Sequence, residues 1–291
     1  MEWKTRITEL LGCKYPILQG AVERIGNWKF AAAVAEAGAH GTITASISKT
    51  PEKLREDIRR CKDSTGGSFG VNLSIGLCPQ IEEMLEVCIE EKVPVETSVY
   101  KPDALSRRIK ESGLKWIHKA ARVKDAVHAQ EQGADAIILV GLEGAGIKNP
   151  EQLPTLTTIV WGRRHITVPL IAAGGIGDAH GFLGALGMGA DGIMMVSAFM
   201  ATQECPIDEK YKQAIIRLSP DNADFSQRVM TARALNKDAP WQPDTAETDW
   251  SRAVSFSAGV IDHVPSVKEL VDGIVHGAEE ILEGWEFLKN R

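Results

Sequence analysis

The chain has 291 residues, 44% of them apolar and 25% charged, a balance typical of a globular protein with a large buried core. Its net charge of −6 argues against nucleic acid as a partner, because proteins that bind nucleic acid usually present a basic face to the phosphates. No apolar run is long enough to cross a bilayer, and the N-terminus lacks the pattern of a signal peptide. We therefore expect a cytoplasmic protein.

Five cysteines are scattered along the chain, with neither a Cys-x-x-Cys pair nor a histidine at metal-ligand spacing. This odd number and wide spacing predict reduced thiols and no metal site.

Short β-rich apolar runs alternate with longer segments of helical periodicity from residue 16 to about residue 200. The strands that we predict cover residues 16–20, 41–46, 69–74, 93–99, 115–120, 135–141, 169–175 and 191–197. Strands that alternate with helices pair in parallel, because a parallel neighbour is reached only through a crossover. The even spacing favours an α/β fold closed into a (β/α)8 TIM barrel, with an open doubly wound sheet as the alternative.

Several helix ends are marked by their residues. Thr50 and Pro51 suit the cap and first turn of a helix, and Gly133 suits the left-handed end of another. Ser266 and Glu269 have the spacing of a capping box ahead of a long apolar stripe. This stripe predicts a C-terminal helix in the outer ring of the barrel, and a partner-binding helix is the alternative.

Residues 205–262 interrupt the alternation with irregular, proline-containing sequence such as "KDAPWQPDTAETDW". We predict that residues 1–204 and 263–291 form the barrel and that this irregular or helical insertion after strand eight covers the barrel mouth. A surface insertion without a catalytic role is the alternative.

The run "PLIAAGGIGDAHGF" loses its side chains at Gly174 and Gly175, directly after the seventh predicted strand. In a parallel barrel the active face lies at the carboxyl ends of the strands, and a phosphate site after strands seven and eight recurs there. Ser197 adds a hydroxyl at the end of strand eight. His180 stands where a dinucleotide fingerprint requires its third glycine, so the run predicts a phosphate on a barrel. A tight strand-to-helix turn is the other interpretation.

The segments "YPILQGAV", "FGVNLS", "WIHKAARVKDAVHAQEQGADAIILVGLEGAG" and "VPLIAAGGIGDAHGFLGALGMGADGIMMVSAFMATQE" resemble one family in order and spacing. It is the family of FMN-dependent nitronate monooxygenases, formerly called 2-nitropropane dioxygenases, which is related to the flavin enoyl-acyl-carrier-protein reductases. The resemblance extends from residue 15 to about residue 272 and is weakest over 205–250. It implies a barrel that holds FMN without a covalent bond.

The resemblance also implies which positions contact FMN. They are a turn after strand one at the ring, an amide at the ring edge, a cationic pair at the end of strand five, a glycine after strand six, and a phosphate site after strands seven and eight. These positions are Gln19, Gly20, Ala21, Val22, Asn72, His118, Lys119, Gly141, Gly174, Gly175, Val196 and Ser197.

The residues by themselves leave alternatives open. Gln19 and Asn72 suit partners for backbone groups as well as for a ring, because buried polar groups must find partners. His118 suits a core histidine, and Lys119 suits a Schiff-base aldolase.

The family usually carries "GHxG" after strand six, whereas this chain reads "GLEGAGIKNPE" and places Ile147 at the position of the histidine. Isoleucine cannot transfer a proton, so general acid–base work needs another titratable group. Glu143, His118 and His180 are the catalytic candidates. A structural part for Glu143 and a place on the helix surface or beside the phosphate for His180 are the alternatives. Tyr100 and Lys101 replace glycine of the relatives and are expected to narrow the substrate pocket.

We therefore predict an FMN-dependent oxidoreductase similar to nitronate monooxygenase, which oxidises a nitronate or a similar small anionic substrate with O2 as acceptor. An NAD(P)H-dependent flavin enoyl or quinone reductase is the alternative. Two further classes are a non-flavin aldolase or isomerase and a catalytically silent flavin-binding protein. Expected partners are a small molecule and O2 or NAD(P)H, without nucleic acid or membrane, and a homodimer is the default expectation.

Overall fold

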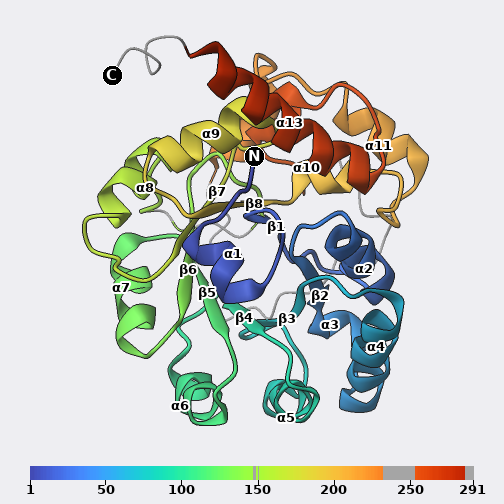
Figure 1. Cartoon of the computed structure of the whole chain (residues 1–291), viewed down its shortest axis with the longest axis vertical. Coiled ribbons are helices and arrows are strands. Elements are labelled where there is room, and N and C mark those ends of the chain that lie inside the picture. The colour runs from blue at the N-terminus through green and yellow to red at the C-terminus, as the bar shows by residue number, and fades with distance from the viewer. Residues whose placement is uncertain (147–148, 150, 232–252, 286–291) are drawn as a thin grey trace.

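The computed structural model describes residues 1–146, 149, 151–231 and 253–285 of the chain. Eight parallel strands in the order β1-β8-β7-β6-β5-β4-β3-β2 alternate with helices, which form a ring around them (Figure 1). The strands are β1 (Ile17–Gln19), β2 (Gly41–Thr44), β3 (Phe69–Ser74), β4 (Val95–Ser98), β5 (Trp116–Ala120), β6 (Ala136–Val140), β7 (Leu170–Ala173) and β8 (Gly192–Met195). The predicted (β/α)8 barrel is confirmed, and the open sheet is wrong because the first strand pairs with the last.

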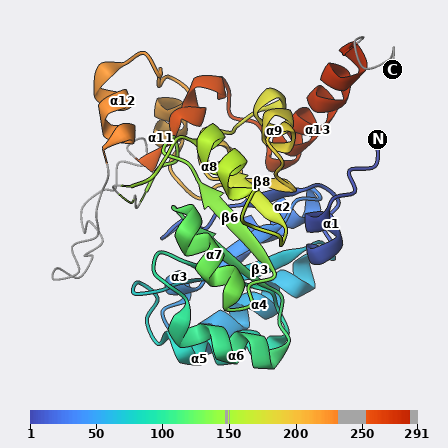
Figure 2. The same ribbon diagram turned by 90° about the vertical axis from the view of Figure 1, so that its left-hand side faces the viewer.

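Most helices lie on the outer side of the strands and follow one another around the ring. The helices are α1 (Arg6–Leu11), α2 (Trp28–Glu36), α3 (Ala45–Ser48), α4 (Pro51–Ser64), α5 (Ile81–Glu91), α6 (Asp103–Ser112), α7 (Val123–Glu131), α8 (Thr155–Gly162), α9 (Ala179–Gly187), α10 (Ser197–Met200), α11 (Glu209–Ile215), α12 (Ala223–Met230) and α13 (Val267–Gly284), with a 3-10 helix η2 (Phe256–Val260). In Figure 2, α11 and α12 lie beyond one end of the barrel.

The seam between β1 and β2 is closed partly by side chains. An isolated bridge joins Leu18 to His40, and beyond it the amide oxygen of Gln19 accepts a hydrogen bond of 3.0 Å from the backbone N–H of Thr42. The Thr42 hydroxyl donates to the Gln19 carbonyl at 2.7 Å. The Gln19 side chain therefore replaces a ladder bond, and the barrel is nearly closed.

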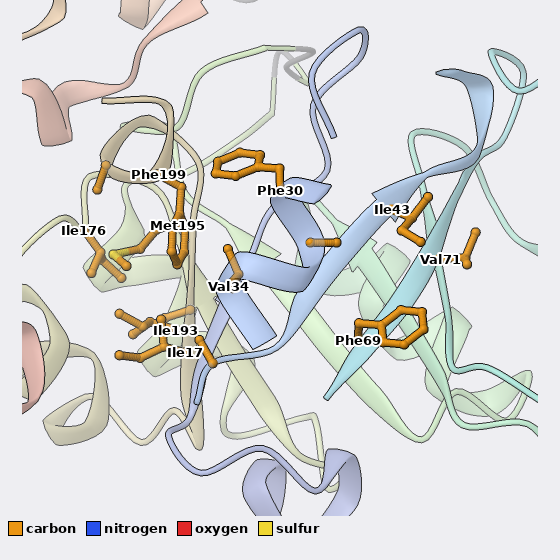
Figure 3. Close-up of a cluster of buried hydrophobic side chains, with 14 of the residues drawn as sticks. Ile17, Phe30, Val34, Ile43, Phe69, Val71, Ile176, Ile193, Met195 and Phe199 are labelled. Carbon is orange, nitrogen blue, oxygen red and sulfur yellow. The ribbon is translucent and has the colours of Figure 1, made fainter. Parts of the chain in front are cut away.

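Two apolar layers stabilise the barrel. The interior contains Leu18, Ile138 and Met194, and α1 lies against it with Ile7 and Leu11. Successive strand residues face opposite sides, so their neighbours point outward to the helices. Figure 3 shows this outer layer, in which Ile17 of β1 and Ile193 of β8 lie side by side, together with Phe30 and Val34 of α2.

The predicted helix ends are confirmed. Thr50 caps α4 by accepting from the backbone of Lys53, and Ser266 and Glu269 form the capping box of α13. Gly133 follows α7 with a φ of +102°. The predicted ends of two strands are wrong, because residues 45–46 begin α3 and Ser197 begins α10.

All five cysteines are buried and free. Among the described helices, none combines the length and the apolar character that a membrane span requires. The insertion after β8 includes α11, α12 and η2, while residues 232–252 lie outside the described part. The proposed division into a barrel and a covering segment stays a prediction.

Candidate functional site

The carboxyl ends of the eight strands share one end of the barrel, which we call the mouth. Gly174 and Gly175 follow β7 there with φ values of +102° and +76°, a region that favours glycine. A Cβ on Gly174 would lie 3.0 Å from both the Gly141 carbonyl oxygen and the Gly144 nitrogen. The loop after β7 therefore passes so close to the loop after β6 that side chains do not fit between them.

Backbone donors are available in this loop. Within the described part of the chain, the N–H groups of Gly175, Ile176 and Gly177 donate to no acceptor. The helix α9 begins directly afterwards and is capped by Asp178, whose carboxylate accepts from the Gly181 N–H at 2.8 Å. N–H groups without partners, next to the positive end of a helix, are suited to an anion.

The end of β8 is less open than the predicted phosphate site requires. The Ser197 hydroxyl is buried, accepts from the Ser255 N–H at 2.9 Å and lies 3.0 Å from the Ser255 hydroxyl. Val196 packs on Gly20, since a Cβ at Gly20 would lie 2.4 Å from its side chain. The hydroxyl of Ser197 is thus occupied, and Gly20 provides the space that Val196 needs.

The turn after β1 leaves one donor without a partner. Gln19 is 1% exposed, and its Nε2 is a buried side-chain atom without a hydrogen bond in the described residues. Its Oε1 accepts a hydrogen bond from the Thr42 N–H. Exchanging the positions of Oε1 and Nε2 would therefore break that bond. Ala21 and Val22 continue the turn, in which the Val22 carbonyl accepts from the Gly26 N–H at 3.0 Å. An unpaired buried donor costs about 1–3 kcal/mol, and a ligand acceptor would remove this cost.

A polar cluster lies on the inner face of β3, β4 and β5, and we call it the inner polar cluster. Its members are Asn72, Ser74, Glu96, Ser98 and Lys119. The Lys119 ammonium lies 3.6 Å from Glu96 Oε1, and Asn72 Nδ2 donates to the same oxygen at 2.9 Å.

Sequence reasoning predicted Asn72 and Lys119 but missed Glu96. The signal was present, because Glu96 and Ser98 are two residues apart in the strand and therefore share its face.

His118 and Lys119 are not brought together. They are consecutive in β5, so their side chains leave opposite faces of the strand. His118 Nδ1 lies 2.8 Å from the Thr97 hydroxyl, and its ring packs edge-on to Trp116 in the outer core. Burial lowers the pKa of His118 to about 4. This placement favours the core-histidine interpretation over a catalytic one.

Glu143 connects three loops at the mouth. Its carboxylate accepts from both the backbone N–H and the hydroxyl of Thr155 at 2.7 Å, at the start of α8. The Thr155 hydroxyl also lies 3.0 Å from the Gly174 carbonyl oxygen, and the Glu143 carbonyl accepts from Phe256. Negative charge at a helix N-terminus is stabilising, so the contacts suit a structural role for Glu143.

The remaining predicted residues lie at the rim. Ile147 falls outside the described residues. Tyr100 packs over Gly76, where a Cβ would lie 2.7 Å from its ring, so the loops after β3 and β4 meet. Val99, just before it, has a φ of +81°, an unusual conformation for a β-branched residue. His180 on α9 has a side chain that is 80% exposed.

A surface hollow of about 290 Å³ lies beside the mouth, between the start of α7 and the helix α8. Its lining includes Arg122, Lys124, Glu151 and Trp161. Arg122 pairs with Asp125 and Glu151, and Lys124 pairs with Glu151. Because these cations are matched by carboxylates, the hollow is not suited to an anion. In the part of the chain described here, no cluster of three or more His, Cys, Asp or Glu side chains is arranged to hold a metal ion.

Comparisons with known proteins show the family of the chain. The family model for nitronate monooxygenase matches residues 4–90 and 77–249 of the chain. A probable nitronate monooxygenase of Staphylococcus aureus is 29% identical, over 73% of this chain and 72% of that protein. A second relative, from Rhodococcus jostii, is 30% identical over 81% of this chain and 66% of its own length. It is described as a (3aS,4S,5R,7aS)-5-hydroxy-7a-methyl-1-oxo-octahydro-1H-indene-4-carboxyl-CoA dehydrogenase.

Solved structures show the same fold. FabK from Thermotoga maritima superposes with a TM-score of 0.85 at 30% identity, covering 98% of this chain and 99% of that one. A nitroalkane oxidase from Streptomyces ansochromogenes superposes with a TM-score of 0.77 over 96% of this chain and 100% of that one, and at 20% identity this likeness shows the fold alone.

Proposed function

Since the chain belongs to the nitronate monooxygenase family, we propose that it is an FMN-dependent enzyme that oxidises a nitronate or a similar small anionic substrate, with O2 as acceptor. Family membership makes the chain an oxidoreductase and implies a flavin. The identity of the flavin, the substrate and the acceptor are the parts that we propose. The observation that carries the proposal is the cradle after β7, which Gly174 and Gly175 form with positive φ values and in which the N–H groups of residues 175–177 have no acceptor in the described chain.

The residues present fit FMN. The N–H groups of Gly175 to Gly177 would hold the phosphate, because they have no acceptor in the described chain and adjoin the start of α9. Gln19 Nε2 would donate to the flavin ring, since it is the buried donor that the turn after β1 leaves unpaired. A phosphate would provide an acceptor for these three consecutive donors, and the glycines on either side of Ile176 leave room for it.

When bound, the flavin supplies the redox chemistry by accepting two electrons from the substrate and passing them to O2. The chain orients the reactants and tunes charge. Lys119 is 23% exposed at the mouth and is paired with Glu96, so its ammonium would face negative charge that forms over the mouth. A nitronate is already an anion, and its oxidation needs no proton abstraction. This suits a chain with Ile147 where the family carries a histidine.

A reductase is the second candidate function. The Rhodococcus relative is described as a carboxyl-CoA dehydrogenase, and the chain is 30% identical to FabK over nearly its whole length. Loss of the histidine at Ile147 also suits NAD(P)H as the electron donor with an enoyl or quinone acceptor. A cytoplasmic location and a homodimer remain expectations in both cases.

Anaerobic mixing of the flavin-loaded protein separates these functions. A nitronate should bleach the flavin absorbance, and admission of O2 should restore it. NADH and NADPH, tested in separate anaerobic samples, should leave the absorbance unchanged over the same period. Bleaching by a nicotinamide and not by a nitronate would contradict the oxidase proposal and favour the reductase. Bleaching by neither would favour the silent flavin-binding protein.

A further inference from the structure

The inner polar cluster buries a carboxylate below the mouth. Glu96 is 5% exposed and bonds to Asn72 on β3, while its counter-charge is the ammonium of Lys119, 3.6 Å away on β5. A barrel interior is usually packed with apolar side chains, and an ionised carboxylate is costly there unless it is paired. A pair at 3.6 Å is weaker than one in hydrogen-bond contact, so the charge state of Glu96 depends on its surroundings.

Few charges act on Glu96. Burial raises its pKa, and Lys119 and the Asn72 hydrogen bond oppose this increase. The neighbouring β3 contributes neutral side chains to the cluster. His40, which directly precedes β2, lies next to Gly70, and burial lowers its pKa to about 4, so it is neutral near pH 7. The protonation state of Glu96 is therefore set by Lys119 and by any charge that forms over the mouth.

We propose that Glu96 is a positioning residue that neutralises Lys119 in the resting site and takes up a proton when an anion forms over the mouth. Protonation of Glu96 then leaves the full positive charge of Lys119 to face that anion. The inference rests on the proposed function, in which reduction of the flavin creates the negative charge. A new negative charge nearby disfavours ionised Glu96, because like charges raise the pKa of a carboxyl group.

The proton balance follows directly. Two-electron reduction of bound flavin would take one proton from solvent and would leave one negative charge over the mouth. A second proton from solvent adds to a carboxylate oxygen of Glu96 and forms an O–H bond. No other bond changes, and two protons are taken up for two electrons. Without Glu96, one proton accompanies the two electrons.

The test is the midpoint potential of the FMN-loaded protein, measured electrochemically across about pH 6–9, a range in which buried carboxyl groups titrate. The slope of this potential against pH counts the protons taken up for each pair of electrons. In the wild type we expect, over part of this range, a slope that corresponds to two protons for two electrons. In Glu96→Gln we expect half that slope, which corresponds to one proton for two electrons. Lys119→Met should also halve it, because Glu96 without a counter-charge stays protonated in both redox states.

Glu91→Gln is the matched control, since Glu91 is a cation-paired carboxylate on α5, outside the barrel. It should keep the wild-type slope. Equal slopes in the wild type and Glu96→Gln, with both proteins binding FMN, would overturn the inference and leave the proposed function standing. If Glu96→Gln does not fold, a wild-type slope in Lys119→Met would overturn it. A wild-type protein that binds no FMN would instead defeat the proposed function.

Discussion

Replacing Gly174 with alanine tests the cradle after β7 directly. The residue has a φ of +102°, and its Cβ would lie 3.0 Å from two backbone atoms of the loop after β6 and 3.1 Å from the Thr155 hydroxyl. Left-handed backbone costs an L-residue about 1–2 kcal/mol. Backbone atoms cannot move aside as a flexible side chain does, so the loop after β7 must shift away from its position at the mouth.

We expect Gly174→Ala to lower the free energy of unfolding of the flavin-free protein by about 1–2 kcal/mol, the cost of the backbone conformation alone. Displacement of the N–H groups that follow should weaken FMN binding by about tenfold or more, since tenfold corresponds to about 1.4 kcal/mol. Urea unfolding gives the first quantity, and quenching of flavin fluorescence during titration gives the second.

Gly184→Ala is the matched control in the helix that follows the same loop. Gly184 lies in α9, where an added Cβ meets no atom within 4 Å. Alanine in a helix is more favourable than glycine by about 1 kcal/mol, so this variant should be as stable as the wild type or more stable, with unchanged FMN affinity. Wild-type FMN affinity in Gly174→Ala would refute the assignment of the cradle to the phosphate.

Three other predictions concern the seam, the buried histidines and the missing histidine of the family. Gln19→Leu should lower the free energy of unfolding of the flavin-free protein by about 1–3 kcal/mol, because a buried N–H of β2 loses its acceptor; urea unfolding with no loss would contradict this role. Burial lowers the pKa of His40 and His118 to about 4. The unfolded chain therefore binds more protons than the folded chain as the pH falls from about 6.5 to about 4, and stability should decrease in that window by up to about 1.4 kcal/mol per pH unit for each histidine. Urea unfolding at several pH values should show a smaller decrease in His118→Gln, and an equal decrease would contradict the assignment. Ile147→His should raise the rate on neutral nitroalkanes in an assay of O2 consumption, and an unchanged rate in a variant that binds flavin would mean that this position does not act on the substrate.

The fold was predictable because a barrel repeats one local pattern. Eight apolar β-rich runs that alternate with helical segments predict parallel strands, and the structure contains all eight. The strand ends were less predictable. The predicted strands include Ala45 and Ser197, whereas in the structure α3 begins at Ala45 and α10 begins at Ser197. The position of α1 against the barrel interior was also missed, because it depends on contacts with distant strands that no local pattern records.

The site was predictable where backbone shape decides it, and less so where side chains decide it. The positive φ values of Gly174 and Gly175 agree with the side-chain-free run after β7. The pair of His118 and Lys119 was interpreted as a unit, although alternation along a strand separates the two side chains. The partner that Lys119 has in the structure, Glu96, comes from another strand, and a single sequence does not give the register that places them together.

The most direct test of the central claim compares the binding of FMN and of riboflavin, which lacks the phosphate, to the flavin-free protein. If the N–H groups after β7 hold the phosphate, FMN should bind with one molecule per chain and with at least about a hundredfold higher affinity, the equivalent of roughly 2.7 kcal/mol from charge-assisted hydrogen bonds. Equal affinities for the two flavins would contradict the claim, and so would a chain that binds neither.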